Sequence, residues 1–241
     1  MSVQDRYPVY EADQRAHFDA KTTEDWAEYS EPGAVALWRY EVDLLLSATR
    51  PSTILDLGCG AGFHDFEMAR RPFVKRVEAV DYSPRSIERA REHFGHPKVH
   101  YTAADFAQPG VLAGTYDLVV SFQVIEHLQD AAGFLRLCRT HCREGGRVAV
   151  FTVNRLRPYN RIRLRQGKPA VMDDPMHCRE FDRAELAELG RQAGLRPPRT
   201  MGYSVGPPWR WQWFGLRLGR WMPWRAERLC ALYEPVGAEQ G

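Results

Sequence analysis

The chain has 241 residues, 44% of them hydrophobic, which is enough for one generous domain with a buried core. Its 33 Lys and Arg nearly balance 31 Asp and Glu, so a general nucleic-acid-binding surface is not indicated. The first residues show no secretory signal, no run of about 18 apolar residues exists, and the five cysteines fit reduced thiols. We therefore expect a cytoplasmic protein that does not span a membrane.

Short apolar runs alternate with helical patterns along most of the chain. A first helix is predicted over 34–49, with an apolar stripe that Pro51 ends. Strands are then predicted at 53–57, 76–80, 98–102, 116–122, 146–153, 197–204 and 227–234, and helices at 63–71, 84–94, 130–142 and 182–193. Short continuous apolar runs are typical of buried parallel strands. The pattern predicts an α/β fold with a doubly wound, mostly parallel seven-stranded sheet in a single domain over 1–241.

The stretch from Ile54 to Gly62 carries the clearest functional signal. An apolar strand runs into an acid and alternate glycines at Gly58, Gly60 and Gly62, and a helical segment follows. Glycines permit a tight strand-to-helix turn and the close approach of a ligand to the N-terminus of the helix. The next strand ends in Asp81, close to the offset of about 20 residues at which an acid meets ribose hydroxyls. Together these features predict a nucleoside site.

A dinucleotide-dependent dehydrogenase would use a similar turn, but its G-x-G-x-x-G pattern is absent, since Phe63 and Asp65 follow Gly62. Asp56 also suits a ligand that carries an ammonium group rather than a pyrophosphate. Cys138, His141 and Cys142 give only part of a zinc pattern, and Cys138 fits an ordinary buried thiol.

Four motifs resemble those of the class I S-adenosylmethionine-dependent methyltransferases, in particular the small-molecule enzymes of the ubiquinone-biosynthesis type. The glycine turn is similar to their first motif and Asp81-Tyr82-Ser83-Pro84 to their acidic motif. Ala104-Asp105-Phe106 is similar to the motif that flanks adenine, and residues 116–128 to the fourth strand with its loop. The resemblance spans about 50–154, and residues 177–181 also fit.

The resemblance implies S-adenosylmethionine as the cofactor and gives a role to each motif residue. Gly58, Cys59 and Gly60 would pass the methionine part, and Asp81 would bind both ribose hydroxyls. Tyr82 would lie against the adenine, Asp105 and the backbone of Phe106 would bind its edge, and Gln123 would face the sulfonium. Ser83 belongs to the acidic motif. Residues 1–50 resemble an N-terminal helical lid, to which Trp26 and Tyr29 would contribute cofactor contacts.

Methyl transfer from a sulfonium is an in-line displacement, and an alcohol or phenol acceptor must also lose a proton. His127 follows the fourth strand at the edge where open α/β sheets bind ligands, which makes it the first candidate base. His177 is the second and His64 the third. Related enzymes show a Glu-x-x-Glu-His pattern linked to a divalent cation. Here Gln123 replaces the first carboxylate, so no metal is expected.

We therefore expect an O-methyltransferase for a small-molecule or lipid-linked acceptor. An N-methyltransferase for a small amine and a non-catalytic cofactor-binding module stay open as alternatives. Nucleic-acid methylation is not expected, because Ser121-Phe122-Gln123-Val124 lacks the Asn/Asp-Pro-Pro-aromatic tetrad of base-modifying enzymes.

Two insertions, 155–180 and 205–226, are expected on the acceptor side of the core 51–154. The basic residues of 155–168 would bind an anion or form a solvated face. The tryptophan-rich segment 209–224 would contact a membrane surface, cover an apolar acceptor, or pack in a core or dimer contact.

Overall fold

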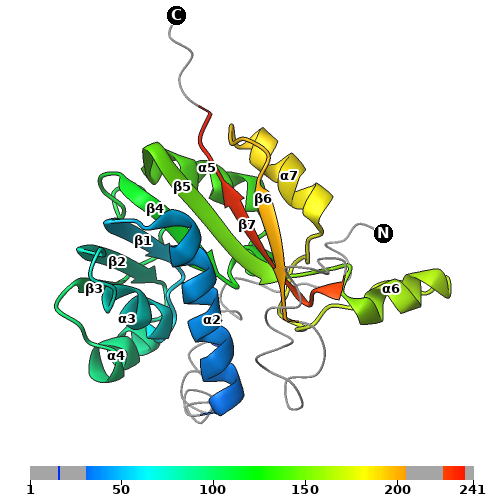
Figure 1. The fold of residues 1–241 in the computed structure, drawn as a ribbon, viewed down its shortest axis with the longest axis horizontal. Helices are drawn as coiled ribbons and strands as arrows, with labels where there is room; N and C mark the ends of the chain where they lie inside the picture. Colours follow the sequence, from blue (N-terminus) through cyan, green and yellow to red (C-terminus); the bar gives the residue numbers. More distant parts are fainter. Residues whose placement is uncertain (1–15, 17–30, 205–224, 237–241) are drawn as a thin grey trace, which may run out of the picture.

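A computed structural model of the protein describes residue 16, residues 31–204 and residues 225–236. Seven strands form one sheet in the order β3-β2-β1-β4-β5-β7-β6 (Figure 1). The strands are β1 Thr53–Leu57, β2 Arg76–Asp81, β3 Val99–Ala103, β4 Tyr116–Phe122, β5 Cys142–Val153, β6 Arg199–Tyr203 and β7 Arg228–Tyr233. β1 to β5 pair in parallel, and β7 runs antiparallel to both β5 and β6. The predicted doubly wound, mostly parallel sheet is confirmed.

Most of the helices begin where the sequence supplies a side-chain cap or a proline. They are α2 Pro32–Thr49, α3 Phe63–Ala69, α4 Pro84–His93, the 3-10 turn η3 Ile125–His127, α5 Ala131–His141, α6 Pro158–Arg165 and α7 Arg183–Gln192. Proline opens α2, α4 and α6, where its missing N–H costs nothing. Asp182 caps α7 in a reciprocal bond with Glu185. Within the described ranges, no helix is long and apolar enough to cross a membrane.

Two elements differ from the sequence prediction. β5 begins at Cys142, four residues before the predicted strand 146–153, because Tyr116 of β4 already pairs with Cys142 ahead of an irregularity in the register. α6 lies in the basic segment, where no helix was predicted. Its apolar residues Ile162 and Leu164 are exposed, so the segment lacks the buried stripe that periodicity detects.

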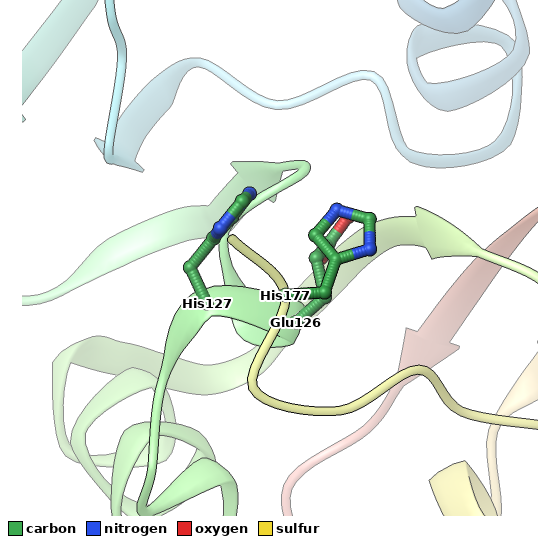
Figure 2. A group of neighbouring side chains, drawn as sticks. All are labelled: Glu126, His127 and His177. Carbon is green, nitrogen blue, oxygen red and sulfur yellow. The ribbon is translucent and has the colours of Figure 1, made fainter. Parts of the chain in front are cut away.

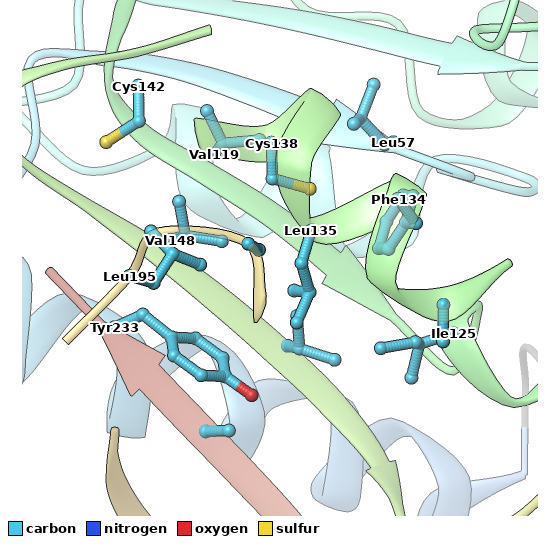
Figure 3. Close-up of a cluster of buried hydrophobic side chains, with 14 of the residues drawn as sticks. Leu57, Val119, Ile125, Phe134, Leu135, Cys138, Cys142, Val148, Leu195 and Tyr233 are labelled. Atoms are coloured by element: carbon cyan, nitrogen blue, oxygen red, sulfur yellow. The ribbon is translucent and has the colours of Figure 1, made fainter. Parts of the chain in front are cut away.

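Helices cover both faces of the sheet. On one face α5 packs Phe134 and Leu135 against strand residues such as Val119 and Val148 (Figure 3). Leu186 of α7 belongs to the same buried cluster. On the other face α2 and α3 bury Leu45 and Met68 against β1, β4 and β5. Both faces of the central strands are therefore buried, which explains their continuous apolar runs. The polar residues that follow these strands lie together at the carboxyl edge of the sheet.

Candidate cofactor and acceptor site

The turn between β1 and α3 is built by its glycines. Gly58, Gly60 and Gly62 have φ angles of 82°, 53° and 84°, in the left-handed region that favours glycine. A Cβ atom on Gly58 would lie 2.4 Å from a Val124 methyl group, and one on Gly62 would lie 2.6 Å from the Tyr101 hydroxyl oxygen. A Cβ on Gly60 would meet nothing within 4 Å. The outer glycines are thus needed for packing, whereas Gly60 borders open space.

That open space is a cavity of about 170 Å³ at the carboxyl ends of β1 and β4. Five residues that the sequence assigned to the cofactor line it: Asp56, Gly58, Cys59, Gly60 and Gln123. The sequence did not predict that α2 would supply Trp38 and Glu41 to the same wall. The cavity therefore joins the glycine turn to the loop after β4, as a nucleoside donor site requires.

Asp81 ties the glycine turn to β2 and α4. Its Oδ2 accepts a hydrogen bond from the backbone N–H of Gly60 at 2.9 Å, and its Oδ1 accepts one from Ser83 N–H at 2.9 Å. Ser83 in turn caps α4 through its hydroxyl, which accepts from Ser86 N–H at 3.0 Å. Asp81 thus lies beside the open glycine of the turn, where a ribose contact was expected.

Three further predicted cofactor residues, Tyr82, Asp105 and Phe106, follow strands at the same edge of the sheet. Tyr82 follows β2 and is partly buried. Asp105 follows β3 and is exposed, and its Oδ1 accepts from Ala107 N–H at 2.8 Å. The Phe106 ring packs 5.6 Å from the Phe134 ring, so its side chain supports the core. Its backbone contact to adenine stays a prediction. Trp26 and Tyr29 lie outside the described residues.

Glu41 organises the wall formed by α2. It is 1% exposed, and its Oε1 accepts a hydrogen bond from the Tyr203 hydroxyl at 2.7 Å. Its Oε2 lies 2.8 Å from Nε2 of His64, whose ring stacks on Phe122 with a centroid distance of 3.9 Å. His64 was the third candidate base. Its pairing and stacking instead indicate a role in positioning the cavity wall.

The two leading histidines meet although 50 residues separate them in sequence. His127 belongs to η3, and His177 lies on the segment between α6 and α7 (Figure 2). Their ring centroids are 4.8 Å apart. Nδ1 of His127 lies 3.2 Å from the Met176 carbonyl oxygen, and Nδ1 of His177 lies 3.2 Å from Oε1 of Glu180. Such partners fix the tautomer and make Nε2 the proton-accepting atom.

Glu126 completes this histidine cluster, which we define as Glu126, His127 and His177. Its carboxyl group is fully buried, Oε2 accepts from the Thr152 hydroxyl at 2.9 Å, and burial raises its pKa. The ligand-type atoms of the three side chains lie within 4.8 Å of one another, so the cluster can hold a divalent cation. The expectation of no metal rested on Gln123, which replaces a carboxylate of the related pattern. Gln123 lines the cofactor cavity and is not one of the three residues of this cluster.

The segment that carries His177 is held by a buried ion pair. Arg157 and Glu180 are 5% and 3% exposed, and their side chains are hydrogen bonded. Burial alone would raise the pKa of Glu180, but the hydrogen bonds from His177 and Arg157 lower it. Arg155 pairs with Asp182 and Glu185. Arg155 and Arg157 of the basic segment thus form ion pairs within the fold, so they do not serve as binding groups for an external anion.

Arg228 links the cofactor cavity to the histidine cluster. Because β7 runs antiparallel to β5, its first residue lies at the carboxyl edge, paired with Val153. Burial lowers the pKa of the Arg228 guanidinium, but negative neighbours raise it overall, among them Glu41 in the cavity wall and Glu126 in the cluster. The loop after β4 joins the two places directly, because Gln123 lines the cavity and His127 N–H donates to the Val124 carbonyl oxygen at 2.9 Å. The histidine cluster therefore lies a few residues along the chain from the cavity wall.

Comparison with known proteins agrees with this geometry. A family model described as a methyltransferase domain matches residues 33–197. The chain belongs to this methyltransferase family. The methyltransferase is 31% identical over 178 residues to a ubiquinone biosynthesis O-methyltransferase of Bordetella pertussis, covering 70% of this chain and 71% of that protein. It is 34% identical over 153 residues to a probable S-adenosylmethionine-dependent methyltransferase of Mycolicibacterium smegmatis, covering 64% of this chain and 55% of that protein. The match thus spans about half the length of that relative.

A solved structure shows the same fold. The N-methyltransferase NodS of Bradyrhizobium japonicum, in complex with S-adenosyl-L-homocysteine, superimposes with a TM-score of 0.63 at 18% identity, covering 92% of this chain and 98% of that one. The expected enzyme class and the expected cofactor, S-adenosylmethionine, are confirmed at the level of the family. The roles of individual site residues and the acceptor remain predictions.

Proposed function

We propose that this methyltransferase transfers the methyl group of S-adenosylmethionine to a hydroxyl oxygen of a small-molecule or lipid-linked acceptor. The observation that carries the proposal is the position of the histidine cluster next to the cofactor cavity. The glycine turn holds the methionine part, with Asp81 on the ribose and Gln123 near the sulfonium. This places the methyl group toward the cluster, where an acceptor oxygen can align for in-line displacement.

The cluster would take the proton of the acceptor hydroxyl. His127 is the less buried of the two rings and follows β4 directly, so we assign it the contact with the acceptor. Glu180 orients the His177 ring, which packs edge-to-face against the His127 ring and holds it in position. A positioned base of this kind contributes about 10²- to 10⁴-fold to the rate. The remaining barrier falls through alignment and exclusion of water, because the sulfonium is already a good leaving group.

An amine acceptor is the second candidate, since the relative with a solved structure is named an N-methyltransferase. An amine needs weaker assistance from a base, so the histidines would matter less. A non-catalytic cofactor-binding module is the third. We also keep the proposal that residues 209–224, which lie outside the described residues, contact a membrane surface, with the protein otherwise cytoplasmic and without a nucleic-acid partner.

The test is transfer of labelled methyl groups into bacterial metabolite and lipid extracts, separated into aqueous and organic phases. His127→Ala and His177→Ala are compared with His100→Asn, an exposed histidine on the edge strand β3. We expect labelled product that both cluster variants reduce at least about 10²-fold while binding of S-adenosyl-L-homocysteine is retained. Product that forms equally well in both variants would favour the amine acceptor. Tight cofactor binding without any product would refute the enzyme and leave the binding module.

A further inference from the structure

Two aspartates lie against each other beneath the glycine turn. Asp56 is in β1 and Asp65 is in the first turn of α3, and both are 0% exposed. Their carboxyl groups are within hydrogen-bonding reach of each other. No other residue that the structure describes donates a hydrogen bond to any of the four carboxyl oxygens. Two ionised carboxylates cannot remain in such a place without a counter-charge, so the pair requires a proton or a cation.

The groups around the pair do not supply that counter-charge. Asp81 at the end of β2 adds a further negative charge, and burial keeps the thiol of Cys59 and the phenol of Tyr101 neutral by raising the pKa of each. His64 of α3 is the nearby group that favours ionisation of Asp56, but its ring is already paired with Glu41 of α2. The surroundings from every neighbouring element are therefore neutral or acidic, apart from this shared histidine.

Both aspartates therefore keep their protons to higher pH than ordinary aspartates do. Burial raises the pKa of Asp56 to about 7, and the charge of Asp81 adds to the effect while His64 opposes it. Burial and the neighbouring Asp56 raise the pKa of Asp65 well above its usual range. The pair titrates as a unit, so just above neutral pH, where the first proton has left and the second has not, it carries about one proton. Asp56 also lines the cofactor cavity, which gives an incoming ligand access to this charge.

We propose that Asp56 and Asp65 hold one shared proton in the ligand-free protein and release it to solvent when the ammonium group of the cofactor binds beside Asp56. The ammonium supplies the positive charge that the proton supplied before, so both carboxylates ionise. Asp65 is then a positioning residue for the methyl donor, although it lies behind the cavity wall. This inference rests on the donor site alone and is independent of the acceptor chemistry.

Proton release gives the affinity for the cofactor a defined pH dependence. The bound state holds fewer protons, so affinity rises with pH, by up to tenfold per unit while the pair is protonated. The α-amino group of the ligand itself loses its proton at alkaline pH, and affinity then falls. The expected profile is therefore a maximum between these two titrations, at slightly alkaline pH.

Calorimetric titration in two buffers of different ionisation enthalpy measures the released protons directly. The probes are S-adenosyl-L-homocysteine, which carries the ammonium group, and 5′-methylthioadenosine, which lacks it. At about pH 8 we expect release of close to one proton with the first probe and none with the second. Equal heats in both buffers with S-adenosyl-L-homocysteine would overturn the proposal. Failure of this probe to bind at all would overturn the donor site and this inference with it.

A matched pair of variants assigns the proton to the aspartates. In Asp65→Asn the amide can donate to the Asp56 carboxylate, so proton release should disappear and affinity should no longer fall below neutral pH. Glu67→Gln lies on the same helix, at a carboxylate paired with Arg39 and Arg70, and should release the proton as the wild type does. Unchanged release in Asp65→Asn would refute the assignment. If Asp65→Asn does not fold, the infrared C=O band of a protonated carboxyl in the wild type must vanish when S-adenosyl-L-homocysteine is added.

Discussion

The two glycines at the end of the turn should respond differently to the same change, alanine. In Gly60→Ala the new methyl group meets no protein atom within 4 Å, so the cost is the left-handed backbone alone, about 1–2 kcal/mol. In Gly62→Ala the methyl group would also lie 2.6 Å from the Tyr101 hydroxyl and 2.8 Å from Cβ of Ala90. Tyr101 cannot easily retreat, because its hydroxyl is held between the carbonyl oxygens of Gly62 and Phe94, at 3.2 and 3.1 Å, and its one proton is shared between them. Overpacking adds about 1–3 kcal/mol.

Gly62→Ala should cost more stability than Gly60→Ala, but Gly60→Ala should cost more affinity for the cofactor. The methyl group of Gly60→Ala projects into the cavity and should weaken binding of S-adenosyl-L-homocysteine at least about tenfold, or about 1.4 kcal/mol. Gly62→Ala should lower the melting temperature more, at about 2–4 °C per kcal/mol for a chain of this size. Denaturant unfolding and calorimetric titration measure the two effects separately. Equal destabilisation by both variants, or wild-type affinity in Gly60→Ala, would refute the assignment of Gly60 to the cavity and Gly62 to packing.

Three further results are expected. Arg157→Met removes the buried cation that pairs with Oε2 of Glu180, and should destabilise the protein by about 3–5 kcal/mol in denaturant unfolding. A loss below about 1 kcal/mol would show that the pair is solvated. The folded-state pKa of Asp56 is raised from 3.8 to about 7, so this group contributes most to the stability of the ligand-free protein below about pH 4. As pH rises from there through 7, the free energy of unfolding should fall by up to about 4 kcal/mol. Asp65→Asn should flatten that slope between pH 5 and pH 8 in the same measurement. Methyl transfer should withstand a metal chelator if the histidine cluster acts as a base, and a loss restored by divalent cations would instead make the cluster a metal site.

Features encoded by neighbouring residues were predicted well from the sequence. The strands, the glycine turn and the acid at the end of β2 each depend on a few adjacent positions, and the structure gives them nearly the predicted bounds. The contact of Glu41 with His64 and Tyr203 was not predictable, because it joins α2, α3 and β6. Its burial has no local signature, since a glutamate within a helical pattern ordinarily faces water.

Asp65 was also missed, but one sequence signal was available. It follows the glycine turn between Phe63 and Phe66, in a short helix that also holds the apolar Met68 and Ala69. A carboxylate within an apolar pattern indicates either an error in the assigned face or a buried charge with a purpose. The pairing of His177 with Glu180 had a comparable signal, because the two residues are three apart. That spacing alone did not reveal that the segment would fold back onto η3.

The reversed direction of β7 has a consequence for how this chain can vary. Tyr203, the last residue of β6, pairs directly with Arg228, the first residue of β7, and Glu227 N–H donates to the Ser204 carbonyl oxygen at 2.8 Å. The connection that includes 205–224 therefore leaves and re-enters the sheet at adjacent points on the edge that carries the site. Changing the length of such a connection costs little, because closure entropy grows only slowly with loop length. The length and sequence of this connection can therefore change while the donor site and the sheet stay unaltered.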